Sequence, residues 1–323
     1  MTTIAIIGGG IAARSLLFAM AKKNIRQKIL VFYSDSFAFP CSVHSTAIVA
    51  PRGISTGHST LGDQLVKGFE RFSRHFEEDM PSGVIKVPQY TAAVTKVDAF
   101  RKRYPMGELK KNILLNEEMY VAEESAFLIR PRDYLGWLLE ESGKNLDIEI
   151  VNEFVTEIKD GKISTVNGSQ YSPDEIIITA GVQNDLWQPF FPESKNPKSV
   201  QGCYLEFQNV RLDAHSFSLT LEGNNLIYDK EMKTLLVGST THESRLELAP
   251  EKELSEIYEN LSQRISLKLP AFPEGVIRTG LREKASKREP YILKKDNLSM
   301  MGGLYKNGYS VSLKLAEDLL PSN

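Results

Sequence analysis

Small residues near the N-terminus have the spacing that a dinucleotide-binding turn requires. Gly8 permits a tight turn, Gly10 lets the backbone approach a pyrophosphate, and Ala13 allows a helix to pack closely on a strand. An apolar run at residues 3–7 precedes them and a helical pattern follows, so the helix N-terminus would face the anion. We predict a nucleotide-binding turn here; the alternative is a tight strand-to-helix turn that binds nothing.

A carboxylate placed to hold a ribose hydroxyl would complete such a unit. Residues 28–33 form a second apolar run, so residues 3–33 are predicted to be one strand–helix–strand unit. Asp35 lies beyond that run, roughly twenty residues after the last small residue of the turn, which is the usual spacing for a ribose contact. An exposed loop aspartate is an equally good interpretation of this position.

The remaining elements indicate a nucleotide-binding domain that is interrupted by a β-rich domain. Apolar periodicity predicts an amphipathic helix at 60–79 and a buried strand at 175–181 that ends in a glycine. Residues 84–127 are predicted to be short strands separated by basic loops such as 101–105. Parallel-type strands near both ends of the chain, with antiparallel-type material between them, favour a discontinuous α/β domain with an insertion. The other predicted elements are helices at 131–141, 252–267 and 311–320, a hairpin of strands at 148–158 and 161–166, and a strand-rich region at 200–245.

Composition excludes several classes of protein. The 323 residues include 39 basic and 41 acidic side chains, and the net charge of −2 favours neither nucleic acid nor an anionic membrane as partner. Two cysteines, Cys41 and Cys203, are too few for a disulfide framework or a four-thiolate zinc site, which favours a reducing compartment. The five histidines show no paired ligand spacing, so no metal is expected.

The apolar N-terminus at residues 4–20 imitates a signal peptide without having its pattern. No basic residue precedes it, three glycines interrupt it, and Arg14 lies in its middle. No run of about twenty apolar residues occurs anywhere in the chain. We therefore expect a soluble, cytoplasmic protein without a membrane partner.

Segments along the whole chain resemble the FAD-dependent D-amino-acid-oxidase superfamily. The resemblance implies a Rossmann-like FAD-binding domain formed by 1–83, 128–199 and 275–323, with an antiparallel β-rich substrate domain formed by 84–127 and 200–274. The segments that carry the resemblance, in the family's order, are 6–12 (IIGGGIA), 31–37 (VFYSDSF), 130–132 (RPR), 178–181 (ITAG), 200–202 (VQG), 280–282 (GLR) with Pro290 eight residues later, and 302–308 (GGLYKNG).

The resemblance also implies which residues contact FAD. The glycine turn and the first helical residues would hold the pyrophosphate, Asp35 would hold the ribose, and the backbone of Val155 would hold the adenine. The segment from Ser42 to Pro51 would run past the pyrophosphate and the flavin ring. The implied FAD contacts are Gly8, Gly10, Ile11, Ala12, Ala13, Asp35, Ser42, His44, Ser45, Thr46, Val155, Ala180, Gly181, Gly303, Asn307 and Gly308.

Arg282 is the candidate for holding the substrate. Members of the family that oxidise amino acids clamp the substrate carboxylate with the arginine that matches Arg282, and a guanidinium offers the planar two-donor fork that this needs. An ion pair with a residue such as Glu283 is the alternative. Tyr228 is the stand-in for the family's substrate-binding tyrosine, and Lys287 occupies a position where the family usually has an acidic residue.

The activity that the resemblance implies is hydride transfer to FAD from the carbon next to an amine nitrogen. The expected substrate is a small-molecule amine or amino acid. The N-terminal motif is most similar to the oxidase half of the bifunctional enzyme that completes the wobble-uridine (5-methylaminomethyl-2-thiouridine) side chain of tRNA. A stand-alone relative acting on tRNA is therefore an alternative, which the near-neutral charge disfavours. A flavin-binding module without turnover is the third hypothesis.

Overall fold

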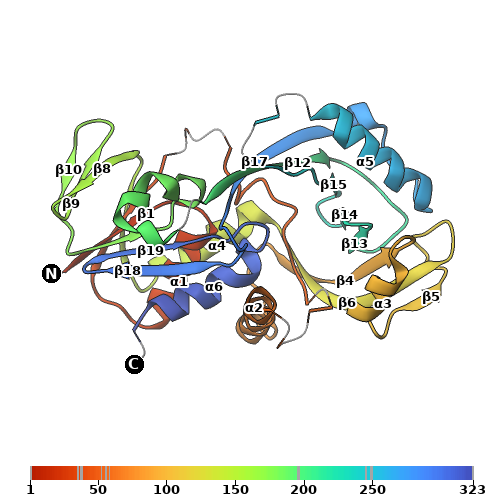
Figure 1. Cartoon of the computed structure of the whole chain (residues 1–323), viewed down its shortest axis with the longest axis horizontal. Helices are drawn as coiled ribbons and strands as arrows, with labels where there is room; N and C mark the ends of the chain where they lie inside the picture. Colours follow the sequence, from red (N-terminus) through yellow and green to blue (C-terminus); the bar gives the residue numbers. More distant parts are fainter. Residues whose placement is uncertain are drawn as a thin grey trace.

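Two large β-sheets lie side by side, helices pack on their outer faces, and a smaller three-stranded sheet lies beside the first of them (Figure 1). The computed structural model describes the chain except for residues 1, 35, 37–38, 52, 55–56, 58, 195–196, 244–245, 248–249 and 322–323. The predicted ribose contact, Asp35, therefore lies outside the described residues.

Short, almost wholly apolar strands form a six-stranded sheet in the order β18-β19-β11-β1-β2-β7. All neighbouring pairs are parallel except β18, which is antiparallel to β19. Strands from near both ends of the chain thus lie next to one another, as a discontinuous nucleotide-binding sheet requires. The strands are β1 (Thr3–Ile7), β2 (Lys28–Phe32), β7 (Asp147–Val151), β11 (Glu175–Ile178), β18 (Tyr291–Lys295) and β19 (Leu298–Gly302).

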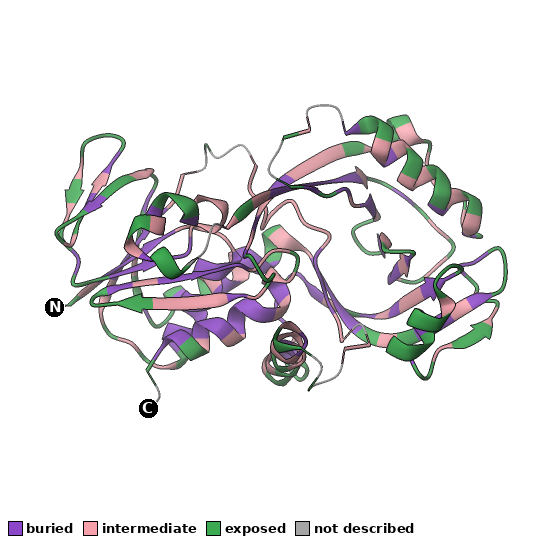
Figure 2. Ribbon diagram, viewed as in Figure 1, coloured by how far each residue is buried: buried purple, intermediate pink, exposed green. Residues whose placement is uncertain are grey.

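Helices cover one face of this sheet. Helix α1 (Ile11–Lys22) contacts α4 (Pro131–Gly143) and α6 (Gly308–Leu319), and α2 (Thr60–Phe76) packs on α6. Ten of the twelve residues of α1 are buried, because the sheet and the neighbouring helices surround it. Figure 2 shows the strands and helices at the centre of this half in the buried colour.

A three-stranded sheet and a 3-10 segment cover the opposite face. Within the small sheet, β9 (Lys162–Thr165) pairs with both β8 (Val155–Lys159) and β10 (Gln170–Tyr171), and the 3-10 segment η1 (Gly181–Phe190) follows β11. Alternate residues of β1 enter different cores: Ile6 packs with the helices, whereas Ile7 packs with the small sheet. Both faces of the sheet are therefore buried, which explains its continuous apolar strands.

The second sheet has ten strands and curves through the right half of Figure 1. Its order is β16-β12-β15-β14-β13-β4-β6-β3, with β17 paired to β12 and β5 paired to β6. Only the pair of β13 with β4 is parallel among these strands. The strands are β3 (Ile48–Val49), β4 (Val84–Ala93), β5 (Glu108–Lys110), β6 (Met119–Ile129), β12 (Lys198–Phe207), β13 (Phe217–Leu221), β14 (Asn224–Asp229), β15 (Thr234–Gly238), β16 (His242–Glu243) and β17 (Val276–Lys284).

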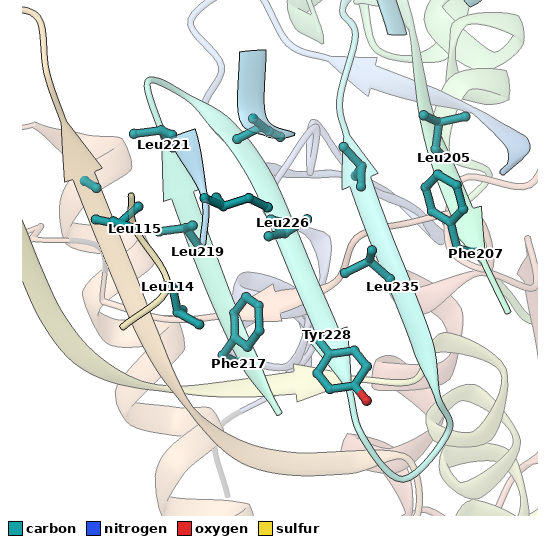
Figure 3. Close-up of a cluster of buried hydrophobic side chains, with 14 of the residues drawn as sticks. Leu114, Leu115, Leu205, Phe207, Phe217, Leu219, Leu221, Leu226, Tyr228 and Leu235 are labelled. Atoms are coloured by element: carbon teal, nitrogen blue, oxygen red, sulfur yellow. The ribbon is translucent and has the colours of Figure 1, made fainter. Parts of the chain in front are cut away.

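One face of this sheet packs under helix α5 (Glu251–Arg264). Leu219, Leu226 and Tyr228 point into the apolar cluster on that face (Figure 3). Thr220 and Asn225 alternate with them along the strands and so lie on the opposite face. The remaining elements are α3 (Val97–Arg103), η2 (Pro192–Ser194) and η3 (Phe272–Glu274).

Residues 84–127 differ from their prediction. They contain β4 and most of β6, strands of 10 and 11 residues that pair along their length, instead of short pieces. The basic stretch at 101–103 is the last turn of α3, where cations are favoured by the helix dipole. The predicted strand at 148–158 is also wrong, because β7 joins the parallel sheet and β8 starts a separate hairpin.

The expected domain boundary at residue 275 does not coincide with a return to the first sheet. Strand β17 follows that residue and pairs with β12 over nine positions of the second sheet, and the chain rejoins the first sheet at β18. The four predicted long helices are present, with ends that differ from the predictions by up to three residues: α2, α4, α5 and α6.

Helix α2 crosses α6 at Gly68. A Cβ at this position would lie 2.2 Å from the main-chain oxygen of Ser310. We predict that Gly68→Ala lowers the free energy of unfolding by about 1–3 kcal/mol, because the helices must separate. Chemical denaturation measures this, with Gly143→Ala as control, since a Cβ there would have no heavy atom within 4 Å. Equal stability of Gly68→Ala and wild type would contradict the close crossing.

None of the helices in the part of the chain that the structure describes has the length and apolar character that crossing a membrane requires.

Candidate active site

A cavity of about 1720 Å³ lies where the two sheets approach each other. Its walls include the turn after β1, the segment at 40–48, the ends of β11 and β19, and the inner face of the ten-stranded sheet. The volume exceeds the ~300–1,000 Å³ that is usual for a drug-sized ligand. The cavity can therefore hold a large cofactor together with a substrate.

The turn after β1 is packed against two neighbouring strand ends. The Gly8 N–H donates to the Phe32 oxygen at 2.8 Å. Gly8 has a φ of +124°, and a Cβ there would lie 2.5 Å from the Thr179 oxygen. Only glycine meets both conditions, which confirms the tight turn that the spacing predicted.

The N-terminus of α1 opens onto the cavity. The Ile11 N–H donates to Ser42 Oγ at 3.0 Å, and a Cβ at Gly10 would lie 2.8 Å from that same oxygen. The first turn of α1 contains no acidic residue. A helix N-terminus on the cavity wall, a hydroxyl and the positive end of the helix dipole together suit a phosphate group.

The segment around Ser42 is anchored across the cavity. The Tyr309 hydroxyl donates to the Ser42 main-chain oxygen, and His44 Nδ1 donates to the Thr279 oxygen at 2.8 Å. A carbonyl partner fixes the proton on Nδ1 of His44. A Cβ at Gly280 would lie 3.0 Å from Cys41 Cα, so a glycine in β17 lets this segment approach the second sheet.

Most of the predicted FAD contacts line this one cavity. Ala13 does not, because it is fully buried between helix and sheet, where it allows the close packing expected of it. Gly303 and Asn307 also do not line it: the Gly303 N–H donates to Glu283, and Asn307 begins helix α6. The predicted contacts that line the cavity are Gly8, Gly10, Ile11, Ala12, Ser42, His44, Ser45, Thr46, Val155, Ala180, Gly181 and Gly308.

Arg282 lies on the cavity wall with its guanidinium over a glycine. A Cβ at Gly202 would lie 2.2–2.5 Å from Nη2, Cζ and Nη1 of Arg282. Gly202 pairs with Gly280 in the register of β12 and β17, so two glycines side by side make room for the guanidinium and for the 40–46 segment. The Nη1 atom is buried and has no hydrogen-bond partner among the described residues.

The alternative ion pair between Arg282 and Glu283 does not form. The two residues are consecutive in β17 and so point to opposite faces of the strand. Glu283 instead receives hydrogen bonds from Asn184 and Tyr291. Its pKa is raised to about 7, mainly because burial disfavours the charged form.

Tyr228 is wrong as the substrate-binding tyrosine. It is 2% exposed, lies in the cluster under α5, and its hydroxyl accepts from the Leu212 N–H at 3.2 Å (Figure 3). It therefore faces away from the cavity. The strand alternation that sends Tyr228 into the core sends Asn225 to the cavity.

Several polar residues on the cavity wall were not predicted. Thr91, Thr220 and Asn225 occupy paired positions of three neighbouring strands and face the cavity as one row. The row could have been found from polar residues inside otherwise apolar strands. Glu283 with its partner Asn184 also escaped prediction, because no sequence spacing joins two residues so far apart.

Among the described residues, no group of three or more His, Cys, Asp or Glu side chains could hold a metal ion.

A glycine turn between a parallel strand and a helix whose N-terminus opens onto a cavity is typical of dinucleotide-dependent α/β enzymes. The chain belongs to the FAD dependent oxidoreductase (DAO) family, whose model matches residues 3–319. A search of curated proteins gave no match. The similarity to the tRNA-acting oxidase has no further support and stays a prediction.

Solved structures share this fold over nearly the whole chain. A glycine oxidase from Bacillus cereus ATCC 14579 has 16% identity and a TM-score of 0.76, with 99% of this chain and 96% of that chain covered. An iminodiacetate oxidase from Chelativorans sp. BNC1 has 15% identity and a TM-score of 0.73, with coverages of 98% and 94%. An L-α-glycerophosphate oxidase from Mycoplasma pneumoniae, with FAD bound, has 15% identity and a TM-score of 0.79, with coverages of 99% and 94%. At such identities the likeness shows the fold.

FAD is the cofactor of this family, and the residues present fit it. The N-terminus of α1 and Ser42 supply donors for a pyrophosphate, and the glycines of the turn keep that space open. The backbone around Val155 lies on the same cavity wall, where an adenine would need main-chain partners.

Proposed function

We propose that this protein oxidises the C–N bond of an amino acid or a secondary amine that carries a carboxylate. FAD, when bound, supplies the chemistry by accepting a hydride from the carbon next to nitrogen. Two of the structural relatives are named for amino-acid or amine substrates, glycine and iminodiacetate, whereas a third is named for L-α-glycerophosphate. The fold is thus compatible with more than one substrate class, and the proposal depends on the residues of this chain.

The observation that carries the proposal is the buried, unpartnered Nη1 of Arg282 on the cavity wall. A guanidinium binds a carboxylate through two parallel N–H donors. No carboxylate of the described residues pairs with Arg282, so its charge is available to a ligand. A buried donor without a partner is costly for the protein, and a substrate carboxylate would remove that cost.

Cys41 next to Arg282, and Tyr309 on the same cavity wall, are neutral. Burial raises the pKa of the Cys41 thiol, and the neighbouring Arg282 only partly opposes this effect. Burial also raises the pKa of Tyr309 well above its ordinary value. The positive charge of Arg282 would therefore orient the carboxylate, while the thiol and the phenol carry no competing negative charge.

Substitution of Arg282 tests the proposal. We expect Arg282→Ala to raise KM for glycine, L-proline and iminodiacetate by about 10- to 100-fold, the value of a charge-assisted pair, and Arg282→Lys to recover part of this loss. Methylamine and pyrrolidine, which lack only the carboxylate, should show no such change. Arg278→Ala is the control, since Arg278 lies on the same strand and pairs with Glu206 at 2.7 Å.

Two outcomes would contradict the proposal. The proposed role of Arg282 in binding the substrate carboxylate is wrong if Arg282→Ala leaves KM for every carboxylated amine unchanged. The C–N assignment is wrong if L-α-glycerophosphate is oxidised with a higher kcat/KM than any amine in this panel.

A further inference from the structure

Glu283 is a buried carboxylate on the cavity wall with no part in the proposed substrate binding. It is 5% exposed and lies on the strand next to Arg282, but it points to the other face of β17. An acidic group in such a place is stabilised only by hydrogen bonds or by protonation. Its partners therefore indicate what it does.

Three donors converge on this carboxyl group. Asn184 Nδ2 and the Gly303 N–H each donate to Oε2 at 2.9 Å, and the Tyr291 hydroxyl donates to Oε1. Burial and the neighbouring Glu283 raise the pKa of Tyr291, so the phenol keeps the proton that it donates. The carboxyl group thus joins three separate segments of the chain.

Asn184 also binds the residue that precedes its own 3-10 segment. Its Oδ1 accepts from the Ala180 N–H at 2.9 Å, while its Nδ2 binds Glu283. Ala180, two residues after β11, and Gly303, directly after β19, are therefore linked through only two side chains. We call Glu283 and Asn184 together the carboxyl–amide clamp.

The two linked segments border the cofactor cavity. Gly181 and Gly302 line it, and Gly181 and Gly303 have φ values of +60° and +71°. Gly302 lies flat against the clamp, because a Cβ there would be 2.4 Å from Asn184 Nδ2 and 2.6 Å from Glu283 Oε2.

We propose that the carboxyl–amide clamp holds the Ala180–Gly181 and Gly302–Gly303 segments in the arrangement that binds FAD, with Glu283 as a positioning residue. Ala180, Gly181 and Gly302 line the cavity, so the placement of these two segments matters for the cofactor. Glu283 accepts a hydrogen bond from the Gly303 N–H and so fixes the backbone next to Gly302, which lines the cavity wall. The clamp acts on FAD affinity and makes no contact with substrate.

The test compares Glu283→Leu, Asn184→Leu and the double variant. Equilibrium dialysis of each holoenzyme against FAD should show binding weaker by about 10- to 100-fold in each single variant, since buried donors lose their acceptor. The double variant should bind FAD at most about twofold more weakly than the single variant with the lower FAD affinity. Both changes break the same clamp, so their effects should not multiply. Asp185→Asn is the control: Asp185 is exposed, is a neighbouring charge on η1, and has no hydrogen bond to Glu283.

Hydrogen exchange supplies a readout that a general loss of stability would not give. The amide of Gly303 should exchange about 10-fold faster in Glu283→Leu, and the amide of Ala180 should do so in Asn184→Leu, because these amides lose their acceptors. Amides in the core of α5 should keep the wild-type rate.

If Glu283→Leu does not fold, Asn184→Ser decides, because it leaves Glu283 bound to Gly303 and Tyr291 and removes only the bonds that Asn184 makes to Ala180 and to Glu283. Unchanged FAD affinity in the folded variants, or effects that multiply in the double variant, would overturn the clamp. No substrate enters these measurements, so their failure would not bear on the oxidation of a C–N bond, and failure of that proposal would leave the clamp intact.

Discussion

Replacing Gly10 with valine is expected to leave a folded protein that does not retain FAD. A Cβ added at Gly10 would lie 2.8 Å from Ser42 Oγ, so an isopropyl group would displace this hydroxyl and fill the space in front of the first N–H groups of α1. Loss of two charge-assisted hydrogen bonds at about 2 kcal/mol each corresponds to about 1,000-fold weaker binding. Flavin absorbance of the purified protein, before and after addition of FAD, measures the effect.

A matched variant separates this effect from a general disturbance of helices. Gly143→Val adds the same side chain at the exposed end of α4, where a Cβ would have no heavy atom within 4 Å. It should purify with the wild-type flavin content. A Gly10→Val protein that keeps a full complement of FAD would place the pyrophosphate elsewhere.

The second large effect is a pH dependence of stability that Glu283 causes. Its pKa is raised from 4.5 to about 7, so the folded state favours the protonated form more than the unfolded state does. The resulting stability is fully present below about pH 4.5, falls as pH rises through about 7, and is then lost. A change of this size corresponds to about 3 kcal/mol.

Glu283→Gln isolates this contribution, because the amide keeps the shape of the side chain and does not titrate in this range. The difference in free energy of unfolding between wild type and Glu283→Gln should change by about 3 kcal/mol from acidic to neutral pH, in favour of the variant at the higher pH. Denaturant unfolding at closely spaced pH values measures it. Parallel curves for the two proteins would show that burial of Glu283 does not shift its titration.

The nucleotide-binding half could be predicted from sequence because its signals are local. The turn at Gly8 and Gly10 depends on a tight bend and close approaches that only small residues allow, and these act within a few positions of the chain. Ala13 likewise packs where its spacing placed it.

The long strands of the second half were missed for an equally local reason. Pro88 lies inside β4, and a proline normally argues against a strand interior. Two glutamates and a serine at 123–125 interrupt the apolar pattern of β6, although they pair with β4 across their length. Strand pairing overrode both local signals, and no single-sequence pattern shows that pairing.

The positions of the residues around the substrate depend on the register between strands, which is not a local property of the sequence. Arg282 was identified by resemblance, but its seat over Gly202 exists because β12 and β17 align with Gly202 opposite Gly280. The contact between Glu283 and Asn184 likewise depends on the tertiary fold, because the two residues are 99 positions apart in the chain. Tyr228 was wrongly predicted to bind substrate, because a shift of one residue along a strand moves a side chain from the cavity face to the core face.

The interleaved order of the six-stranded sheet has a consequence for biosynthesis. Strand β1 is made first, yet β11 separates it from β19, and α1 packs on α6 near the end of the chain. A ribosome-bound chain that lacks these last elements leaves the apolar face of α1 and one edge of β11 uncovered. The FAD cavity is therefore completed only after α6 has been synthesised, and a chain released before that point would expose apolar surface that cellular proteases recognise.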